Sequence, residues 1–220
     1  MSALRPRTLD HVAFWVAGRG VVVAFLVEQL GLRVIADEAN FTLLGGGARR
    51  GKLTLFDAPG PREPGPLAEV VLSVPEFQAT VDRVGGELVD AGEGIRIRLV
   101  AGTPGDVIDL AGVVLLASDP AATASAYERY GFERVGDARV EVAGAFVEFV
   151  AGDAAIPERP LLNHLAVLVD SAQGQADIAQ TLGIEVESMV DAANTIAAFL
   201  TGPGGVRIEY VEHKPTFSLT

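Results

Sequence analysis

Three side chains in this sequence have types and positions that suit metal chemistry: His11, His164 and Glu209. Each histidine lies near the start of an apolar segment, Leu9–Val16 in one case and Asn163–Val169 in the other. Imidazole and carboxylate groups bind divalent first-row metals, so two histidines and one carboxylate could form a metal site. A single histidine in a strand is more often an ordinary buried residue. The argument for a site therefore depends on the elements that carry these residues.

Composition places the chain among globular proteins and excludes several kinds of partner. Of 220 residues, 49% are apolar, and no apolar run approaches the roughly 20 residues of a membrane span. The formal net charge of -12 argues against a nucleic-acid partner. The absence of cysteine removes disulfides and thiolate metal ligands, and it fits a cytoplasmic protein. We therefore expect a small-molecule partner, with neither nucleic acid nor membrane.

The same order of elements occurs four times, with a period of roughly fifty residues. Each copy has an apolar strand, a helix closed by glycine, and then several short strands. The four copies begin at Leu9–Val16, Leu67–Val74, Val113–Ala117 and Asn163–Val169. In the third copy, Ser118-Asp119-Pro120 predicts the start of the helix, because proline is favoured at the first helical position, and Gly131 predicts its end.

A βαβββ unit leaves one face of its sheet exposed, so two units must pair into an incompletely closed, eight-stranded barrel. Four units predict an α+β fold with two such barrels. We divide the chain into two regions, 1–111 with modules 1 and 2, and 112–220 with modules 3 and 4. The sequence leaves open whether neighbouring modules pair, or whether module 1 pairs with 4 and module 2 with 3. Ligands are expected in the concave face between paired modules.

Three motifs resemble the vicinal oxygen chelate superfamily: Leu9–Val16, Asn163–Val169 and Gly202–Glu209. That superfamily includes glyoxalase I, extradiol dioxygenases, methylmalonyl-CoA epimerase and the bleomycin and fosfomycin resistance proteins. The resemblance covers nearly the whole chain. It implies a glyoxalase-like fold, a divalent metal ion and a small-molecule substrate, and it is compatible with a homodimer.

In that superfamily the metal ligands come from the first and fourth strands of each paired module. Alignment of the four copies gives these pairs of positions: His11 and Leu55, Glu69 and Asp109, Val113 and Glu148, His164 and Glu209. If module 1 pairs with module 4, the metal ligands are His11, His164 and Glu209. If module 3 pairs with module 4, Glu148 replaces His11. We predict the first set, which favours Fe2+ or Mn2+, with Zn2+ or Ni2+ as alternatives.

The resemblance implies a metal-dependent enzyme of the extradiol dioxygenase type that acts on a small oxygenated organic molecule. The sequence departs from the dioxygenase pattern at Leu200, where a tyrosine is usual, and at 192–194, where no acid–base histidine occurs. Two alternatives remain open: a glyoxalase- or epimerase-type lyase or isomerase, and a metal-free binding protein. We expect Glu69 and Asp109 to face solvent or to pair with arginines such as Arg98. His213, after the last strand, is expected at the surface.

Overall fold

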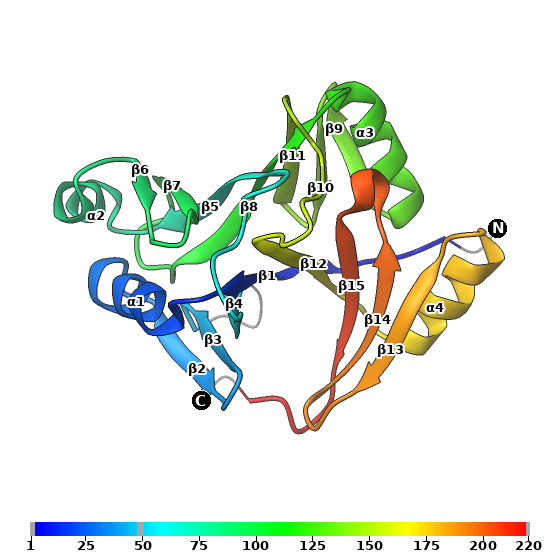
Figure 1. The fold of residues 1–220 in the computed structure, drawn as a ribbon, viewed down its shortest axis with the longest axis horizontal. Coiled ribbons are helices and arrows are strands. Elements are labelled where there is room, and N and C mark those ends of the chain that lie inside the picture. Colours follow the sequence, from blue (N-terminus) through cyan, green and yellow to red (C-terminus); the bar gives the residue numbers. More distant parts are fainter. Residues whose placement is uncertain (1–2, 48–50, 219–220) are drawn as a thin grey trace.

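The computed structural model describes residues 3–47 and 51–218, and these form two β-sheets with helices at the periphery (Figure 1). Fifteen strands lie in this part of the chain, eight in one sheet and seven in the other, and neither sheet closes into a barrel there. The predicted α+β, glyoxalase-like class is confirmed. The second sheet has seven strands where eight were predicted.

The first module contains β1 (Thr8–Val16), α1 (Arg19–Ala24), the π-helical segment η1 (Phe25–Gln29), β2 (Arg33–Asp37), β3 (Phe41–Gly45) and β4 (Lys52–Asp57). Gly31 ends its helical region with φ of 79°, a backbone conformation that glycine adopts without strain. β4 lies parallel to β1, so the module ends beside the strand with which it began.

The second module contains β5 (Leu67–Val74), α2 (Phe77–Val84), β6 (Leu88–Asp90) and β7 (Arg96–Ala101). It has one strand fewer than the first module, which accounts for the seven-stranded sheet. Asp109, which the alignment of the four copies placed on the fourth strand of this module, is not part of it. Asp109 and Leu110 instead begin β8 of the third module, and β7 is the strand that lies parallel to β5.

The third module contains β8 (Asp109–Ala117), α3 (Pro120–Tyr127), the 3-10 turn η2 (Glu128–Tyr130), β9 (Glu133–Gly136), β10 (Arg139–Val142) and β11 (Ala145–Ala151). The predicted helix start is confirmed. Pro120 is the first helical residue, and the Asp119 side chain accepts a hydrogen bond from the Ala122 backbone N–H at 3.0 Å.

The fourth module contains β12 (Leu162–Leu168), α4 (Ala172–Thr181), β13 (Val186–Asp191), β14 (Thr195–Thr201), the 3-10 turn η3 (Pro203–Gly205) and β15 (Arg207–His213). Ser171 caps α4, because its hydroxyl accepts a hydrogen bond from the Gly174 backbone N–H at 3.1 Å. β15 lies parallel to β12, as β4 does to β1 in the first module.

The first and last modules pair with each other. The first sheet has the order β13-β14-β15-β12-β1-β4-β3-β2, and the second has β6-β7-β5-β8-β11-β10-β9. Each sheet thus combines one module from 1–111 with one from 112–220, and the boundary between those two regions lies inside β8. This pairing brings β1 beside β12 in the middle of the first sheet (Figure 1).

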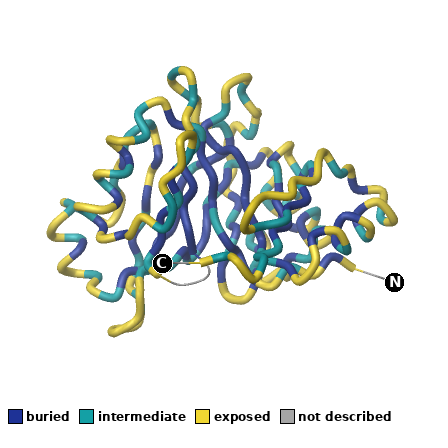
Figure 2. Tube along the Cα trace, turned by 90° about the horizontal axis from the view of Figure 1, so that it is seen from below, coloured by how far each residue is buried: buried dark blue, intermediate teal, exposed yellow. Residues whose placement is uncertain are grey.

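Buried residues follow the strands, while the helices and loops carry most of the exposed residues (Figure 2). Phe14 and Leu55 are fully buried in the apolar core of the first sheet. Among the described residues, no helix has the length and hydrophobicity that a membrane crossing requires.

Candidate metal centre

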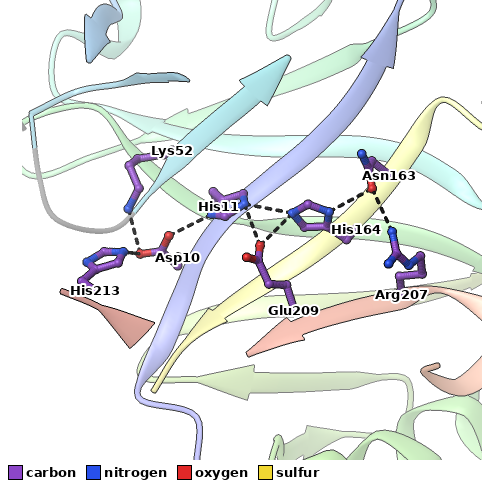
Figure 3. Close-up of polar contacts among 8 residues, drawn as sticks. All are labelled: Asp10, His11, Lys52, Asn163, His164, Arg207, Glu209 and His213. Carbon is purple, nitrogen blue, oxygen red and sulfur yellow. Dashed lines mark hydrogen bonds and ion pairs between the residues drawn. The ribbon is translucent and has the colours of Figure 1, made fainter. Parts of the chain in front are cut away.

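His11 and His164 face each other across the antiparallel pair β1–β12 (Figure 3). His11 pairs with Ala166, and Ala13 pairs with His164, so the two histidines occupy equivalent places about the local two-fold axis of the strand pair. Their Nε2 atoms lie 3.0 Å apart, although 153 residues separate them in the chain. The pairing of the first and last modules is what brings them together.

A one-residue shift in strand register occurs directly before each histidine. Asp10 is the extra residue on β1, and Asn163 is the extra residue on β12, as in two β-bulges. In a regular strand, adjacent side chains project to opposite faces. Here Asp10 Oδ2 instead lies 2.8 Å from His11 Nδ1, and Asn163 Oδ1 lies 3.0 Å from His164 Nδ1. Each bulge therefore places a polar partner beside the histidine that follows it.

Glu209 completes the predicted set. On β15 it lies beside Ala166, and its Oε2 atom is 2.8 Å from His164 Nε2 and 3.1 Å from His11 Nε2. One ligand atom from each of the three residues lies within 4.8 Å of the others, and all three residues are buried. Glu209 Oε2 has no hydrogen bond of acceptable geometry, so a buried acceptor remains unsatisfied at the centre of the cluster. Two imidazole nitrogens and a carboxylate oxygen that converge in this way fit a divalent cation.

Two further residues, which the sequence did not indicate, support His11 through Asp10. Lys52 Nζ donates a hydrogen bond to Asp10 Oδ1 at 2.7 Å, and both side chains are 1% exposed. His213 Nε2 lies 3.2 Å from the same oxygen. The expectation that His213 lies at the surface is wrong: its side chain is 6% exposed, and Phe217 stacks on its ring at 3.9 Å. β15 extends to His213, and the chain then folds back over it.

The partner of His164 has its own support. Arg207 Nη1 lies 3.4 Å from Asn163 Oδ1, and Arg207 Nε donates a hydrogen bond to Glu187 Oε2 at 2.6 Å. The guanidinium group also lies over the Phe199 ring, 4.6 Å from its centroid. Polar contacts thus form one continuous row from Lys52 to Arg207 through both histidines (Figure 3).

In the metal-free protein, the pKa values of His11, His164 and Glu209 depart from their ordinary values. Burial acts to lower the pKa of His11, but hydrogen bonds to Asp10 and Glu209 outweigh burial and raise that pKa to about 9. Burial dominates at His164 and lowers its pKa. Burial acts to raise the pKa of Glu209, but the two histidines hold that pKa well below its usual range. At neutral pH, His11 is therefore protonated and Glu209 ionised.

The fourth ligand position of the first sheet belongs to Thr54 and not to Leu55. Thr54 lies beside Ala13 as Glu209 lies beside Ala166. The prediction of Leu55 was one residue out of register, which moves a side chain to the opposite face of a strand. Leu55 is in the core, whereas Thr54 lines the cleft above the cluster.

The equivalent positions in the second sheet carry no comparable ligand set. Strand register assigns them to Glu69, Arg98, Gly112 and Glu148. The predicted positions Asp109 and Val113 are therefore wrong. Asp109 was misplaced because the second module lacks a strand, and Val113 because of the bulge in β8. Glu69 accepts two hydrogen bonds from Arg98, at 2.7 and 2.9 Å, which is one of the expected alternatives for this carboxylate. Glu148 lies 3.9 Å from Arg139, in a different sheet from His164.

The three candidate ligands lie in a cleft of about 540 Å³, a size typical of small-molecule sites. The aromatic side chains that line it are Phe41, Phe56, Phe199 and Phe217. Asp10, Lys52 and Thr54 line the same cleft, and most of its exposed wall is apolar. This arrangement suits a small molecule with an apolar body and a polar end directed at the cluster.

Neither a protein-family model nor a curated protein sequence matches the chain. Solved structures do resemble it. A "putative dioxygenase" from Bacillus subtilis superposes with a TM-score of 0.78 at 17% identity, over 97% of this chain and 87% of that one. Glyoxalase I from Zea mays superposes with a TM-score of 0.73 at 16% identity, over 93% and 92% of the two chains. The cppA protein of Streptococcus pneumoniae gives a TM-score of 0.67 at 14% identity, over 94% and 98%. At these identities the likeness shows the fold alone, and the chain has a glyoxalase-like fold.

Proposed function

We propose that the protein is a metal-dependent enzyme that binds a small oxygenated organic molecule through two adjacent oxygens, in the manner of an extradiol dioxygenase. One observation carries the proposal: two histidine nitrogens and an unsatisfied, buried carboxylate oxygen converge at the base of an apolar cleft. His11, His164 and Glu209 would hold the cation. A divalent cation bound there would act as a Lewis acid on the two substrate oxygens.

Several residues of the chain would support this chemistry without touching the cation. Phe56 and Phe199 lie beside His164, with ring centroids 6.4 and 5.3 Å from its own, and would pack against the apolar body of the substrate. Their packing also excludes water from one side of the cluster, which strengthens the electrostatic interactions within it. Thr54 occupies the fourth position with a side chain that is a poor metal ligand, so coordination positions stay available for two substrate oxygens.

Two histidines and one carboxylate favour Fe2+ or Mn2+ over the alternatives Zn2+ and Ni2+. In the glyoxalase- or epimerase-type alternative a ligand carboxylate, Glu148 or Glu209, would move the proton, and of these two Glu209 lies in the cluster. Glu148 lies in the other sheet. The metal-free binding protein remains as the outcome if no cation binds.

Metal analysis of the purified protein tests the proposal. We expect one divalent ion per chain after anaerobic incubation with Fe2+ or Mn2+ and removal of excess metal. His164→Ala and Glu209→Gln should lose it, because each removes one of three ligands. Glu148→Gln is the matched control, since it removes a carboxylate from the equivalent place in the second sheet, and it should retain the ion. Wild-type protein that binds no stoichiometric metal would refute both enzymatic alternatives.

The reaction type needs a separate measurement. The Fe2+ protein should consume oxygen in the presence of a catechol, and His164→Ala should not. Metal binding without oxygen uptake, together with turnover of a hemithioacetal or an acyl-CoA ester, would instead identify the glyoxalase- or epimerase-type alternative.

A further inference from the structure

The β-bulge that precedes each histidine occurs in all four modules. The extra residues are Asp10 and Asn163 in the first sheet, and Ala68 and Ala111 in the second. The residues that follow them are, in the same order, His11, His164, Glu69 and Gly112. The backbone irregularity is thus common to both sheets, but a polar residue occupies it only where a histidine follows. The fold explains the bulge, and it does not explain why the bulge residue is polar.

Hydrogen bonding determines which nitrogen of each ring carries the hydrogen. The Asp10 carboxylate only accepts, so the hydrogen between it and His11 must be on His11 Nδ1. Arginine only donates, so the Asn163 atom beside Arg207 is the oxygen, and this oxygen must also accept from His164 Nδ1. When a cation replaces the proton on His11, each neutral ring presents a lone pair on Nε2, the atom that points at Glu209.

Each bulge residue is itself held in place by groups from other strands. Asp10 is 1% exposed and lies between Lys52 of β4 and His213 of β15. Asn163 is 8% exposed and lies beside Arg207 of β15. Because these partners are fixed, neither bulge side chain can turn to present a different atom to its histidine. The two partners differ in charge, since Asp10 is a carboxylate and Asn163 is a neutral amide.

We propose that Asp10 and Asn163 are positioning residues that hold His11 and His164 with Nε2 directed at a common cation. This inference rests on the proposed function, because it assumes that the site binds a metal ion. It adds that the two histidine ligands are not equivalent. A carboxylate partner makes an imidazole a stronger donor than an amide partner does, so His11 is the more strongly donating ligand. Lys52 offsets the charge of Asp10, so this support adds no net charge beside the cation.

The variant Asp10→Asn tests the positioning role of Asp10. Its amide oxygen would remain with Lys52, and its NH2 group would then face His11 Nδ1 and favour the hydrogen on Nε2. We expect the Zn2+ dissociation constant to rise about 10–100-fold. In the Zn2+ form, long-range 15N–1H spectra should show whether Nε2 of His11 still binds. The chain has three histidines, so His213→Asn completes the assignment of the ring signals.

The variants Asn163→Ala and Asn163→Asp test the positioning role of Asn163. The first measurement on them needs no metal. In the metal-free protein at pH 8, His164 should carry its hydrogen on Nδ1 in the wild type and in Asn163→Asp, which keeps an acceptor. Asn163→Ala should lose this preference. A purely structural role would make both variants equally harmful, whereas a positioning role predicts that Asn163→Asp restores metal affinity to within a few-fold of wild type.

The outcomes separate the inference from the proposed function. If the wild-type protein binds no metal, the proposed function fails, and the metal-free spectra of His164 still test the role of Asn163. If the wild type binds metal and Asp10→Asn binds it within twofold with unchanged ring signals, the inference about Asp10 is overturned. If Asp10→Asn does not fold, the two Asn163 variants decide the matter.

Discussion

Arg98 occupies in the second module the strand position that Glu209 occupies in the fourth, as Glu148 does in the third. Arg98 lies beside Val71, two residues after Glu69, as Glu209 lies beside Ala166, two residues after His164. One repeated unit thus carries a carboxylate for a cation in one sheet and a guanidinium in the other. The guanidinium neutralises Glu69 directly, so in the second sheet a side chain does what we propose a metal ion does in the first.

The first prediction follows from this contrast. Arg98→Ala should leave metal stoichiometry and affinity unchanged, because the second sheet contains no histidine and we expect it to bind no ion. Its effect on the free energy of unfolding should be about 1 kcal/mol or less, since Arg98 is 42% exposed and such ion pairs contribute little. Metal analysis and urea unfolding measure both effects. A second ion per chain, either in the wild type or in Arg98→Ala, would contradict this contrast between the two sheets.

The second prediction concerns pH and the metal-free protein. The pKa of His11 is raised from 6.5 to about 9, so the folded protein binds this proton more tightly than the unfolded chain does. The resulting stabilisation is complete below about pH 6.5 and is lost as pH rises to about 9. The free energy of unfolding, measured with urea, should fall across this window. His11→Gln should lack the slope, and metal affinity of the wild type should rise over the same range because the proton must leave Nε2. If the free energy of unfolding of the wild type does not change across this pH range, the raised pKa of His11 is refuted.

The third prediction concerns Lys52, whose ion pair with Asp10 is almost completely buried. Lys52→Met should lower the free energy of unfolding by about 3–5 kcal/mol, because it removes one partner of a buried ion pair. Adding Asp10→Asn to Lys52→Met should recover part of that loss, since the buried carboxylate charge is then gone. Chemical denaturation of the two single variants and the double variant gives the coupling energy. Additive losses would mean that the pair is not coupled.

The four modules and the three candidate ligands could be predicted because their signals are local. Each helical region is followed by a glycine, and His11 and His164 both lie near the start of an apolar strand. Which modules pair could not be predicted. Pairing depends on contacts between β1 and β12, which are 153 residues apart at His11 and His164, and no short stretch of sequence encodes them.

The wrong predictions have two physical causes: strand register, and contacts between strands that are distant in the chain. Thr54 was missed in favour of Leu55 because a shift of one residue exchanges the two faces of a strand. Lys52 and His213 were missed because they reach Asp10 from β4 and β15, which are distant in the chain. A signal for Asp10 was present, since a polar residue that can accept a hydrogen bond precedes the histidine in both copies.

The fourth prediction tests the register at that position. Thr54→Glu should fold, because residue 54 lines the cleft, and its carboxylate should tighten metal binding while it competes with a bidentate ligand. Leu55→Glu should be strongly destabilised, because residue 55 is fully buried in the core and a charge there has no partner. Thermal unfolding and Zn2+ titration distinguish the two. The reverse pattern would restore Leu55 as the position that faces the metal.

The fifth prediction concerns Phe217, which closes the cleft on the side of His213. The segment that carries Phe217 is held by hydrogen bonds from the Lys214 backbone N–H to the Asn194 carbonyl at 2.9 Å and from the Thr216 hydroxyl to the Ala193 carbonyl at 3.1 Å. Because Phe217 lines the cleft and stacks on His213, Phe217→Ala should enlarge the cleft and leave the metal ligands in place.

The measurement is the affinity of the Co2+-loaded protein for catechol and for 4-tert-butylcatechol, followed by visible absorption. Phe217→Ala should shift the ratio of the two affinities about 10-fold towards the bulkier ligand, a typical effect of added space in an apolar pocket. Phe146→Ala, which removes an aromatic ring packed against Arg139 in the second sheet, is the control and should leave the ratio unchanged. An unchanged ratio in Phe217→Ala would show that Phe217 does not limit the size of the ligand.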